Sequence, residues 1–234
     1  MSSNPAHQAL IKAVGLKKAY KRGSEEIVAL WDINLSIFPG EFIVIIGPSG
    51  SGKSTLLHLL GGIDRPTDGE LCVNGVDLVA ASEAALTRFR RDNLGFVFQF
   101  YNLLPSLNAL DNVILPLLAK GMSWKTSRAR GAAMLELVGL NHRQKHTPGQ
   151  LSGGEQQRVA IARAMVVEPC VILADEPTGD LDSASAKSII ALMVDLNQRL
   201  GVTFVVATHN LNLLHVASRS YELVDGHLNP ISGG

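Results

Sequence analysis

The chain has 234 residues, and its 21 Lys and Arg balance its 21 Asp and Glu to a formal net charge of +0. This length suits one sizeable domain, or one domain with a small subdomain. The neutral charge argues against a surface for polyanions, so we expect no nucleic-acid partner. No run of the sequence reaches the roughly 18 apolar residues that span a bilayer, so we expect no direct membrane span and a membrane role only through a partner.

Hydrophobic residues make up 46% of the chain and aromatic residues only 5%, which is typical of an aliphatic α/β core. The two cysteines, Cys72 and Cys170, both lie in apolar, strand-like runs. We expect them to be buried thiols rather than a disulfide, and this cysteine usage indicates a reducing compartment.

The N-terminal region has the pattern of an antiparallel β region. Residues 10–19, 27–30 and 33–38 are each predicted to form a strand, and Pro39-Gly40 then turns the chain. Residues 42–46 form a short apolar run rich in β-branched side chains, which predicts a buried parallel strand. The N-terminal β region therefore leads directly into a parallel core.

A glycine-rich loop with the pattern G-x-x-x-x-G-K-S follows this strand and precedes a predicted helix. Strand, loop and helix in this order form a P-loop, whose backbone N–H groups and helix dipole bind phosphate. Lys53 is expected to reach the β- and γ-phosphates, and the Ser54 hydroxyl is expected to ligate Mg²⁺. A glycine-rich turn that matches by accident is the alternative, which the flanking elements disfavour. The residues expected to bind ATP here are Gly47, Pro48, Ser49, Gly50, Ser51, Gly52, Lys53, Ser54 and Thr55.

Beyond the P-loop, a helix is predicted over 82–91 and a strand over 94–98. The next stretch is different, because it contains helical patterns over 109–120 and 123–138 and no strand pattern. We interpret it as a helical subdomain inserted into the α/β core, with an exposed face that could bind another protein.

The remaining elements alternate again between strand and helix. They are a helix over 153–167, a strand over 170–174, a helix over 183–200, a strand over 202–207, a short helix over 211–217 and a hairpin over 221–229. Alternation predicts an α/β P-loop fold with an open, mostly parallel sheet and helices on both faces. We expect one domain, with the core over about 10–98 and 147–229 and the helical subdomain over about 99–146.

Two carboxylates follow the buried strand that ends at residue 174. Ligands in open α/β sheets bind at the carboxyl ends of strands, so Asp175 is placed to hold Mg²⁺ and Glu176 to polarise a water that attacks the γ-phosphate. The alternative is that Asp175 and Glu176 belong to an ordinary polar turn. The P-loop elsewhere in the chain favours the functional interpretation.

The helix predicted from Gly153 begins with a second glycine-containing motif. Ser152 and Glu155 have capping-box spacing, which is by itself an ordinary helix start. Two consecutive glycines in a first turn, Gly153 and Gly154, cost on the order of 1–2 kcal/mol against alanine. That cost is understandable if backbone N–H groups approach a phosphate closely. The P-loop already binds one phosphate in this chain, so the natural ligand is ATP bound by a second copy.

In this combination, the P-loop, the strand-end carboxylates and the motif at residues 151–157 resemble the ATP-binding cassette ATPases of ABC transporters. The resemblance covers about residues 10–229, and residues 151–157 match the family's signature sequence closely. It implies ATP hydrolysis with ATP and Mg²⁺ as cofactors, and a homodimer that pairs head to tail around two ATP molecules. The signature residues implied to contact ATP in trans are Leu151, Ser152, Gly153, Gly154, Glu155 and Gln156.

The resemblance implies roles at further positions. Tyr20 resembles the aromatic residue that stacks on adenine, although a strand-end tyrosine with no ligand is the alternative. Gln99 resembles the glutamine that contacts Mg²⁺ and the attacking water, and His209 resembles the histidine that contacts the γ-phosphate. The loop that crosses to the other protomer corresponds to Gly179, Asp180, Leu181 and Asp182. Asp180 stands where a small residue is frequent, and Asp182 could instead cap the next helix.

Within the family, residues 58–64 and 98–105 look most like the branch that serves lipoprotein release and macrolide-type export. This implies integral membrane permease subunits as partners and a cytoplasmic location, peripheral on the inner face of the cell membrane. The alternative is an ATP-driven signalling or scaffolding subunit of a membrane complex that transports nothing. Chromosome- or translation-associated cassettes are disfavoured, because no heptad run separates the P-loop from Ser152.

Overall fold

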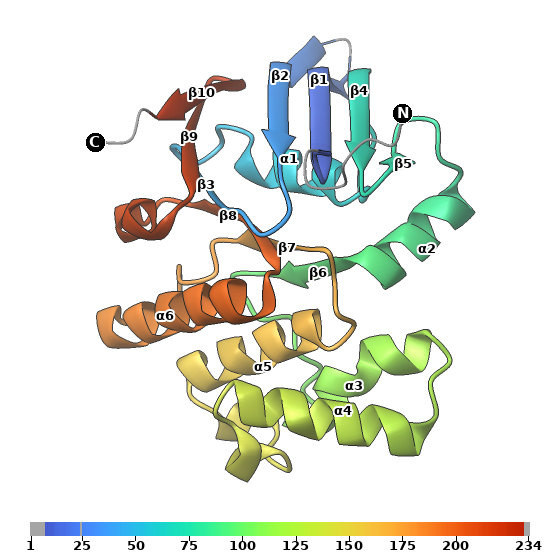
Figure 1. Ribbon diagram of the computed structural model, residues 1–234. Helices are drawn as coiled ribbons and strands as arrows, with labels where there is room; N and C mark the ends of the chain where they lie inside the picture. The colour runs from blue at the N-terminus through green and yellow to red at the C-terminus, as the bar shows by residue number, and fades with distance from the viewer. Residues whose placement is uncertain (1–7, 24, 232–234) are drawn as a thin grey trace.

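The computed structural model describes residues 8–23 and 25–231. They form two β-sheets and the helices that cover them (Figure 1). The first sheet has the strand order β2-β1-β4-β5, and the second has the order β10-β9-β3-β8-β7-β6. Within these residues no helix combines the length and the apolar character needed to cross a bilayer.

The first sheet is antiparallel and consists of β1 (Ile11–Arg22), β2 (Glu25–Ile37), β4 (Asp68–Val73) and β5 (Val76–Asp77). The prediction of two separate strands over 27–30 and 33–38 is wrong, because β2 is continuous through Asp32. Pairing with β1 holds the strand together, and register shifts between the two strands absorb its irregularity, including the left-handed Asp32 with φ 51°.

The second sheet is parallel except at one edge. β3 (Phe42–Ile46), β8 (Thr203–Thr208), β7 (Val171–Asp175) and β6 (Leu94–Val97) run in parallel, and β9 (Arg219–Val224) joins β3 from the other side. The predicted C-terminal hairpin is confirmed as β9 with antiparallel β10 (His227–Ile231). The carboxyl ends of β3, β7 and β8 therefore lie together at one edge of the sheet.

Alternate residues of the parallel strands enter two different hydrophobic clusters, because successive side chains point to opposite faces. Ile43 and Ile45 of β3 pack with α1 (Lys53–Leu60), α2 (Glu83–Asn93) and the antiparallel sheet. Phe42 and Val44 pack on the other side with α5 (Gly153–Met165) and α6 (Ser183–Leu200). Both faces are buried, as the sequence predicts for an α/β fold.

The predicted helical insert contains α3 (Ala109–Ala119) and α4 (Trp124–Leu137). Both helices belong to the hydrophobic cluster that also contains α5 and α6, so the insert shares its core with the neighbouring α/β elements (Figure 1). Pro116 lies inside α3. The short 3-10 helices η2 (Asn141–Arg143) and η3 (Pro148–Gln150) follow α4, and the predicted helix over 211–217 is the 3-10 helix η4 (Leu211–Val216).

Both cysteines are free thiols. They are partly buried, not fully buried as the apolar runs around them suggested. The Cys170 thiol donates to the carbonyl of Asn93, at 3.2 Å, and burial raises the pKa of this thiol to about 11. Cys170 is therefore protonated at neutral pH and a poor nucleophile.

Candidate functional site

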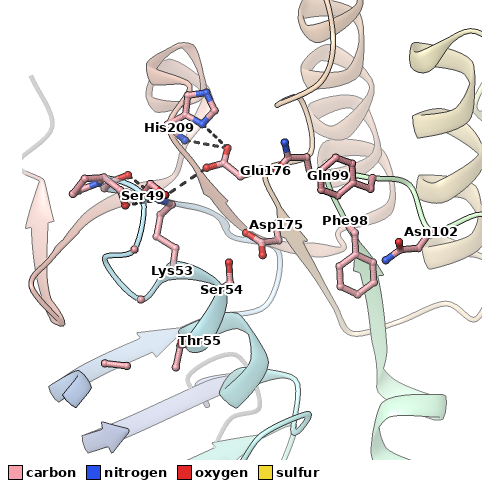
Figure 2. Close-up of a pocket in the computed structure, with 16 residues that line it drawn as sticks. Ser49, Lys53, Ser54, Thr55, Phe98, Gln99, Asn102, Asp175, Glu176 and His209 are labelled. Atoms are coloured by element: carbon pink, nitrogen blue, oxygen red, sulfur yellow. Dashed lines mark hydrogen bonds and ion pairs between the residues drawn. The ribbon is translucent and has the colours of Figure 1, made fainter. Parts of the chain in front are cut away.

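A cavity of about 700 Å³ lies where β3, β7 and β8 end. Figure 2 shows side chains from the P-loop, from the ends of β7 and β8 and from the segment after β6 around this space. Its lining residues are Ala29, Gly47, Pro48, Ser49, Gly50, Gly52, Lys53, Ser54, Thr55, Phe98, Gln99, Phe100, Asn102, Asp175, Glu176 and His209. The fold therefore brings the P-loop, both strand-end carboxylates, Gln99 and His209 to one place.

The P-loop has the expected strand–loop–helix geometry. Gly52 precedes α1 in a left-handed conformation, with φ 103°, and a Cβ atom there would lie 2.7 Å from the carbonyl oxygen of Ala29. A residue with a side chain would be strained at this position and would also clash with β2. Ser51 is the P-loop residue that does not line the cavity; its buried hydroxyl has no hydrogen-bond partner among the described residues.

The side chain of Lys53 is buried against the P-loop residues that precede α1. Its Nζ donates to the carbonyl oxygens of Gly47, at 2.8 Å, and Pro48, at 3.0 Å. The same ammonium lies 3.9 Å from Oε1 of Glu176 (Figure 2). The loop therefore holds a positive charge at the floor of the cavity, where it can attract an anion.

Glu176 lies just beyond β7, in a left-handed conformation with φ 46°. Its Oε2 atom accepts hydrogen bonds from Thr208 Oγ1, at 3.1 Å, and from the backbone N–H of His209, at 3.2 Å. The His209 Nδ1 atom lies 2.9 Å from the same oxygen (Figure 2). Two hydrogen bonds and the imidazole beside the same oxygen hold the carboxylate in one orientation, with Oε1 on the side of Lys53.

Three potential Mg²⁺ ligands line the same cavity. Ser54 begins α1, Asp175 ends β7 and Gln99 follows β6, and Figure 2 shows Ser54 and Asp175 extending toward each other. Hydroxyl, carboxylate and amide oxygens are the hard ligands that Mg²⁺ prefers. No cluster of three or more His, Cys, Asp or Glu suited to a metal occurs in residues 8–23 and 25–231. The donor set therefore fits an ion that takes its other ligands from phosphate and water.

Gln99 also connects the cavity to the loop after Glu176. Its Nε2 donates to Oδ1 of Asp180, at 2.9 Å. Asp180 was the unusual residue of the loop 179–182, and here its carboxylate holds the Gln99 amide. Asp182 caps α6, because its Oδ1 accepts from the backbone N–H groups of Ala184 and Ser185. Loop residues 179–182 do not line the cavity.

The signature residues, 151–156, lie at the start of α5 and also do not line the cavity of this chain. The predicted capping box is confirmed: Ser152 Oγ accepts from Glu155 N, and Glu155 Oε2 accepts from Ser152 N, at 2.8 Å. The hydrogen bond from Ser152 N is the main cause that lowers the pKa of Glu155. This carboxylate therefore stays ionised over the helix start.

The first signature glycine also has a packing reason within the chain. A Cβ atom on Gly153 would lie 2.9 Å from the Tyr101 hydroxyl and 3.2 Å from Cδ2 of Leu181. Tyr101 has a left-handed φ of 55°, and Arg163 of α5 donates to its carbonyl oxygen at 2.8 Å. The segment after Gln99 thus lies directly against the start of α5, a contact that the sequence pattern did not reveal.

Tyr20 lies outside the cavity lining. Its hydroxyl donates to Oδ2 of Asp64, at 2.9 Å, and the ammonium of Lys18 lies 4.7 Å from the centre of its ring. Lys18 also donates to Asp64, at 2.6 Å. No sequence motif indicated a role for Lys18, Asp64 or Thr208. Thr208 had one usable signal, because it is a polar residue at the carboxyl end of a strand whose central residues are apolar.

Comparison with known proteins gives consistent matches over nearly the whole chain. Residues 30–179 match the protein family described as ABC transporter. The lipoprotein-releasing system ATP-binding protein LolD of Coxiella burnetii is 49% identical over 214 residues, which cover 91% of this chain and 92% of that protein. The LolD protein of Idiomarina loihiensis is 46% identical, covering 96% of this chain and 99% of that protein.

Two solved structures share the fold. One is a dimeric, post-hydrolysis state of the ATP-binding cassette MJ0796 bound to ADP and phosphate, with a TM-score of 0.86 and 44% sequence identity. It covers 96% of this chain and 100% of the solved chain. The second is a dimeric structure of the same cassette, with a TM-score of 0.86 and 45% identity over the same coverage.

Proposed function

Because the chain belongs to the ABC transporter family, in which it is an ATP-binding and ATP-hydrolysing subunit, we propose that it powers lipoprotein release from a membrane through integral permease subunits. The observation that supports ATP hydrolysis best is the joint placement of Lys53, Glu176 and His209 around one cavity. The lipoprotein substrate is proposed from the names of relatives that match more than nine-tenths of the chain.

In this proposal the P-loop binds the phosphates of ATP. An incoming γ-phosphate competes with the Gly47 and Pro48 carbonyls for the ammonium of Lys53. The glycine-rich backbone and the start of α1 supply N–H donors for the β-phosphate. Tyr20 would stack on adenine from the edge of the site.

Mg²⁺ would be held by Ser54, Asp175 and Gln99 together with phosphate oxygens. When bound, the ion neutralises charge on the phosphates and orients them for in-line attack. Gln99 keeps an amide oxygen free for this role, because its Nε2 atom is the one that bonds to Asp180.

Glu176 would act as the general base. A water molecule on its Oε1 side gives a proton to the carboxylate as its oxygen attacks the γ-phosphorus, and the bond to ADP breaks. His209, whose side chain is 69% exposed, would contact the γ-phosphate. An exposed imidazole can turn toward the ligand without breaking the packing around it.

The signature residues 151–156 would complete the site of a second copy. Each ATP lies between one P-loop and the partner's helix start, so its γ-phosphate binds both protomers and closes the dimer. Loop residues 179–182 would contact the partner between the two sites. Hydrolysis removes the γ-phosphate that links the two protomers and lets the dimer open. The membrane subunits sense this opening through Gln99 and the predicted subdomain at 99–146.

This trans site is tested by placing a negative charge on it. Gly154→Asp adds a carboxylate in the first turn of α5, where it suits the helix dipole and so leaves the helix stable. Its Cβ would lie 3.4 Å from Ser185, which is ordinary van der Waals contact. We expect ATP hydrolysis to fall about 30-fold or more, because the charge repels the partner's γ-phosphate. ATP binding by the lone chain should stay within about 3-fold, because its own P-loop is intact.

The matched control is Gly149→Asp, which adds the same charge nearby where a side chain meets nothing within 4 Å. Hydrolysis is followed by phosphate release, and binding by titration of a fluorescent ATP analogue at a concentration where the chain is monomeric. A Gly154→Asp chain that loses ATP binding as a monomer would mean that the signature acts in cis. Equal losses in both variants would mean a general charge effect.

The names of the relatives favour transport over the signalling or scaffolding alternative. The two are separated by the membrane subunits that purify with the chain and by release of a lipoprotein from vesicles that contain them. In the proposal the chain is cytoplasmic and peripheral on the inner face of the membrane. ATP-dependent release that stops when Glu176 is replaced would support transport, and ATP turnover with no release would support the alternative.

A further inference from the structure

Thr208 lies behind the carboxylate that the proposed mechanism uses. It is the last residue of β8, pairs with Ile46 of β3 and is fully buried. Its hydroxyl contacts two groups: it donates to Glu176 Oε2, at 3.1 Å, and accepts from the backbone N–H of Asn210, at 3.0 Å. Thr208 thus connects the end of one central strand to the side chain at the end of another.

The Asn210 contact decides where the hydroxyl hydrogen points. A threonine hydroxyl has one hydrogen to donate and two lone pairs that accept. Because the Asn210 N–H donates to Thr208 Oγ1, a lone pair of the hydroxyl is used there, and the hydrogen is left for Glu176. A hydrogen bond to an ionised carboxylate is stronger than one between neutral groups, so this donor holds Oε2 firmly.

The groups that contact Oε2 differ in how easily they can leave. His209 Nδ1 belongs to a side chain that is 69% exposed, and the proposed mechanism turns it toward the γ-phosphate. Thr208 is 0% exposed and held by the strand pairing of β8 with β3. When the imidazole leaves, Thr208 Oγ1 and the His209 backbone N–H remain on Oε2.

We propose that Thr208 is a positioning residue for hydrolysis: its hydroxyl holds Oε2 of Glu176 so that Oε1 is the atom that faces the attacking water. This inference rests on the proposed role of Glu176 as the base. Thr208 itself exchanges no proton with the water. The proton passes from the water to Oε1, while the water oxygen bonds to the γ-phosphorus and the bond to ADP breaks.

Thr208→Val keeps the shape of the side chain and removes the hydroxyl. We expect single-turnover hydrolysis by the full chain to slow about 10- to 100-fold, from the loss of a hydrogen bond to a charged group. The lifetime of the ATP-bound dimer, measured by light scattering after dilution, should lengthen correspondingly. ATP affinity should stay within about 3-fold, because Thr208 does not line the cavity.

Two further variants separate the hydroxyl from its surroundings. Thr208→Ser restores the donor and should hydrolyse within about 3-fold of the unmodified chain. Thr203→Val removes a buried hydroxyl at the other end of β8, where Thr203 accepts from Gly40 N at 3.0 Å, and should leave hydrolysis nearly unchanged. Thermal unfolding of all three variants reports any loss of stability.

The inference is overturned if Thr208→Val hydrolyses at the normal rate, or if Thr208→Ser loses as much as Thr208→Val. Its failure is distinguishable from failure of the proposed base. Normal activity of Glu176→Gln would contradict the assignment of Glu176 as the base. Loss of activity in Glu176→Gln together with normal activity in Thr208→Val would contradict only the positioning role of Thr208. In a Glu176→Gln background, Thr208→Val should add no further loss, because the two residues act as one unit.

Discussion

Replacing Glu176 with glutamine is expected to lower hydrolysis by at least about 100-fold, since general-base catalysis typically supplies 10²–10⁴-fold. The amide has the same shape as the carboxylate, and its oxygen can still accept from Thr208 Oγ1 and His209 N, which now bind Oε2. It cannot take a proton from water. ATP binding is retained, because Lys53 and the rest of the P-loop are untouched, and the bound ATP is trapped.

Trapped ATP should convert the monomer into a stable dimer, which light scattering with and without ATP and Mg²⁺ measures directly. Glu136→Gln is the matched control, because Glu136 is an exposed residue of α4 that does not line the cavity. A monomer that binds ATP tightly and never pairs would contradict the shared site for the isolated chain. Normal hydrolysis by Glu176→Gln would contradict the assignment of the base.

Lys53→Met should strongly weaken ATP binding itself. The substitution keeps most of the side-chain length and removes an ammonium that is buried against the Gly47 and Pro48 carbonyls. Truncating one partner of a buried charge pair costs about 2–5 kcal/mol, so ATP affinity should fall about 30-fold to more than 1,000-fold. Titration of a fluorescent ATP analogue against the monomer measures the loss.

Lys125→Met provides the comparison, because Lys125 is an exposed residue at the start of α4 and changes the net charge equally. ATP affinity within about 3-fold of the unmodified chain would contradict the role of Lys53, because a buried ammonium that binds phosphate contributes more than that. The Lys53→Met and Glu176→Gln variants are expected to differ in the step that they lose. Lys53→Met loses ATP affinity, whereas Glu176→Gln keeps ATP binding and loses hydrolysis.

The sequence by itself determined the parts of this protein that depend on neighbouring residues. The P-loop pattern, the apolar strand before it and the helix after it are adjacent in the chain, so their order alone predicted a phosphate site, and the structure has the strand, loop and helix there. The capping box of Ser152 and Glu155 and the helix cap at Asp182 could also be predicted from the sequence, because each hydrogen bond spans three residues or fewer. The parallel sheet followed from the alternation of strands and helices along the chain.

Tertiary structure alone decided the contacts between residues far apart in the chain. The pairing of β1 with β2 made one strand where local polarity at Asp32 suggested two. The bonds of Gln99 to Asp180, Tyr20 to Asp64 and Thr208 to Glu176 join residues 81, 44 and 32 positions apart. A motif states which residue types are present, but only the packing of β7 and β8 side by side brings a threonine hydroxyl to a carboxylate, because neither residue has a sequence neighbour that requires the other.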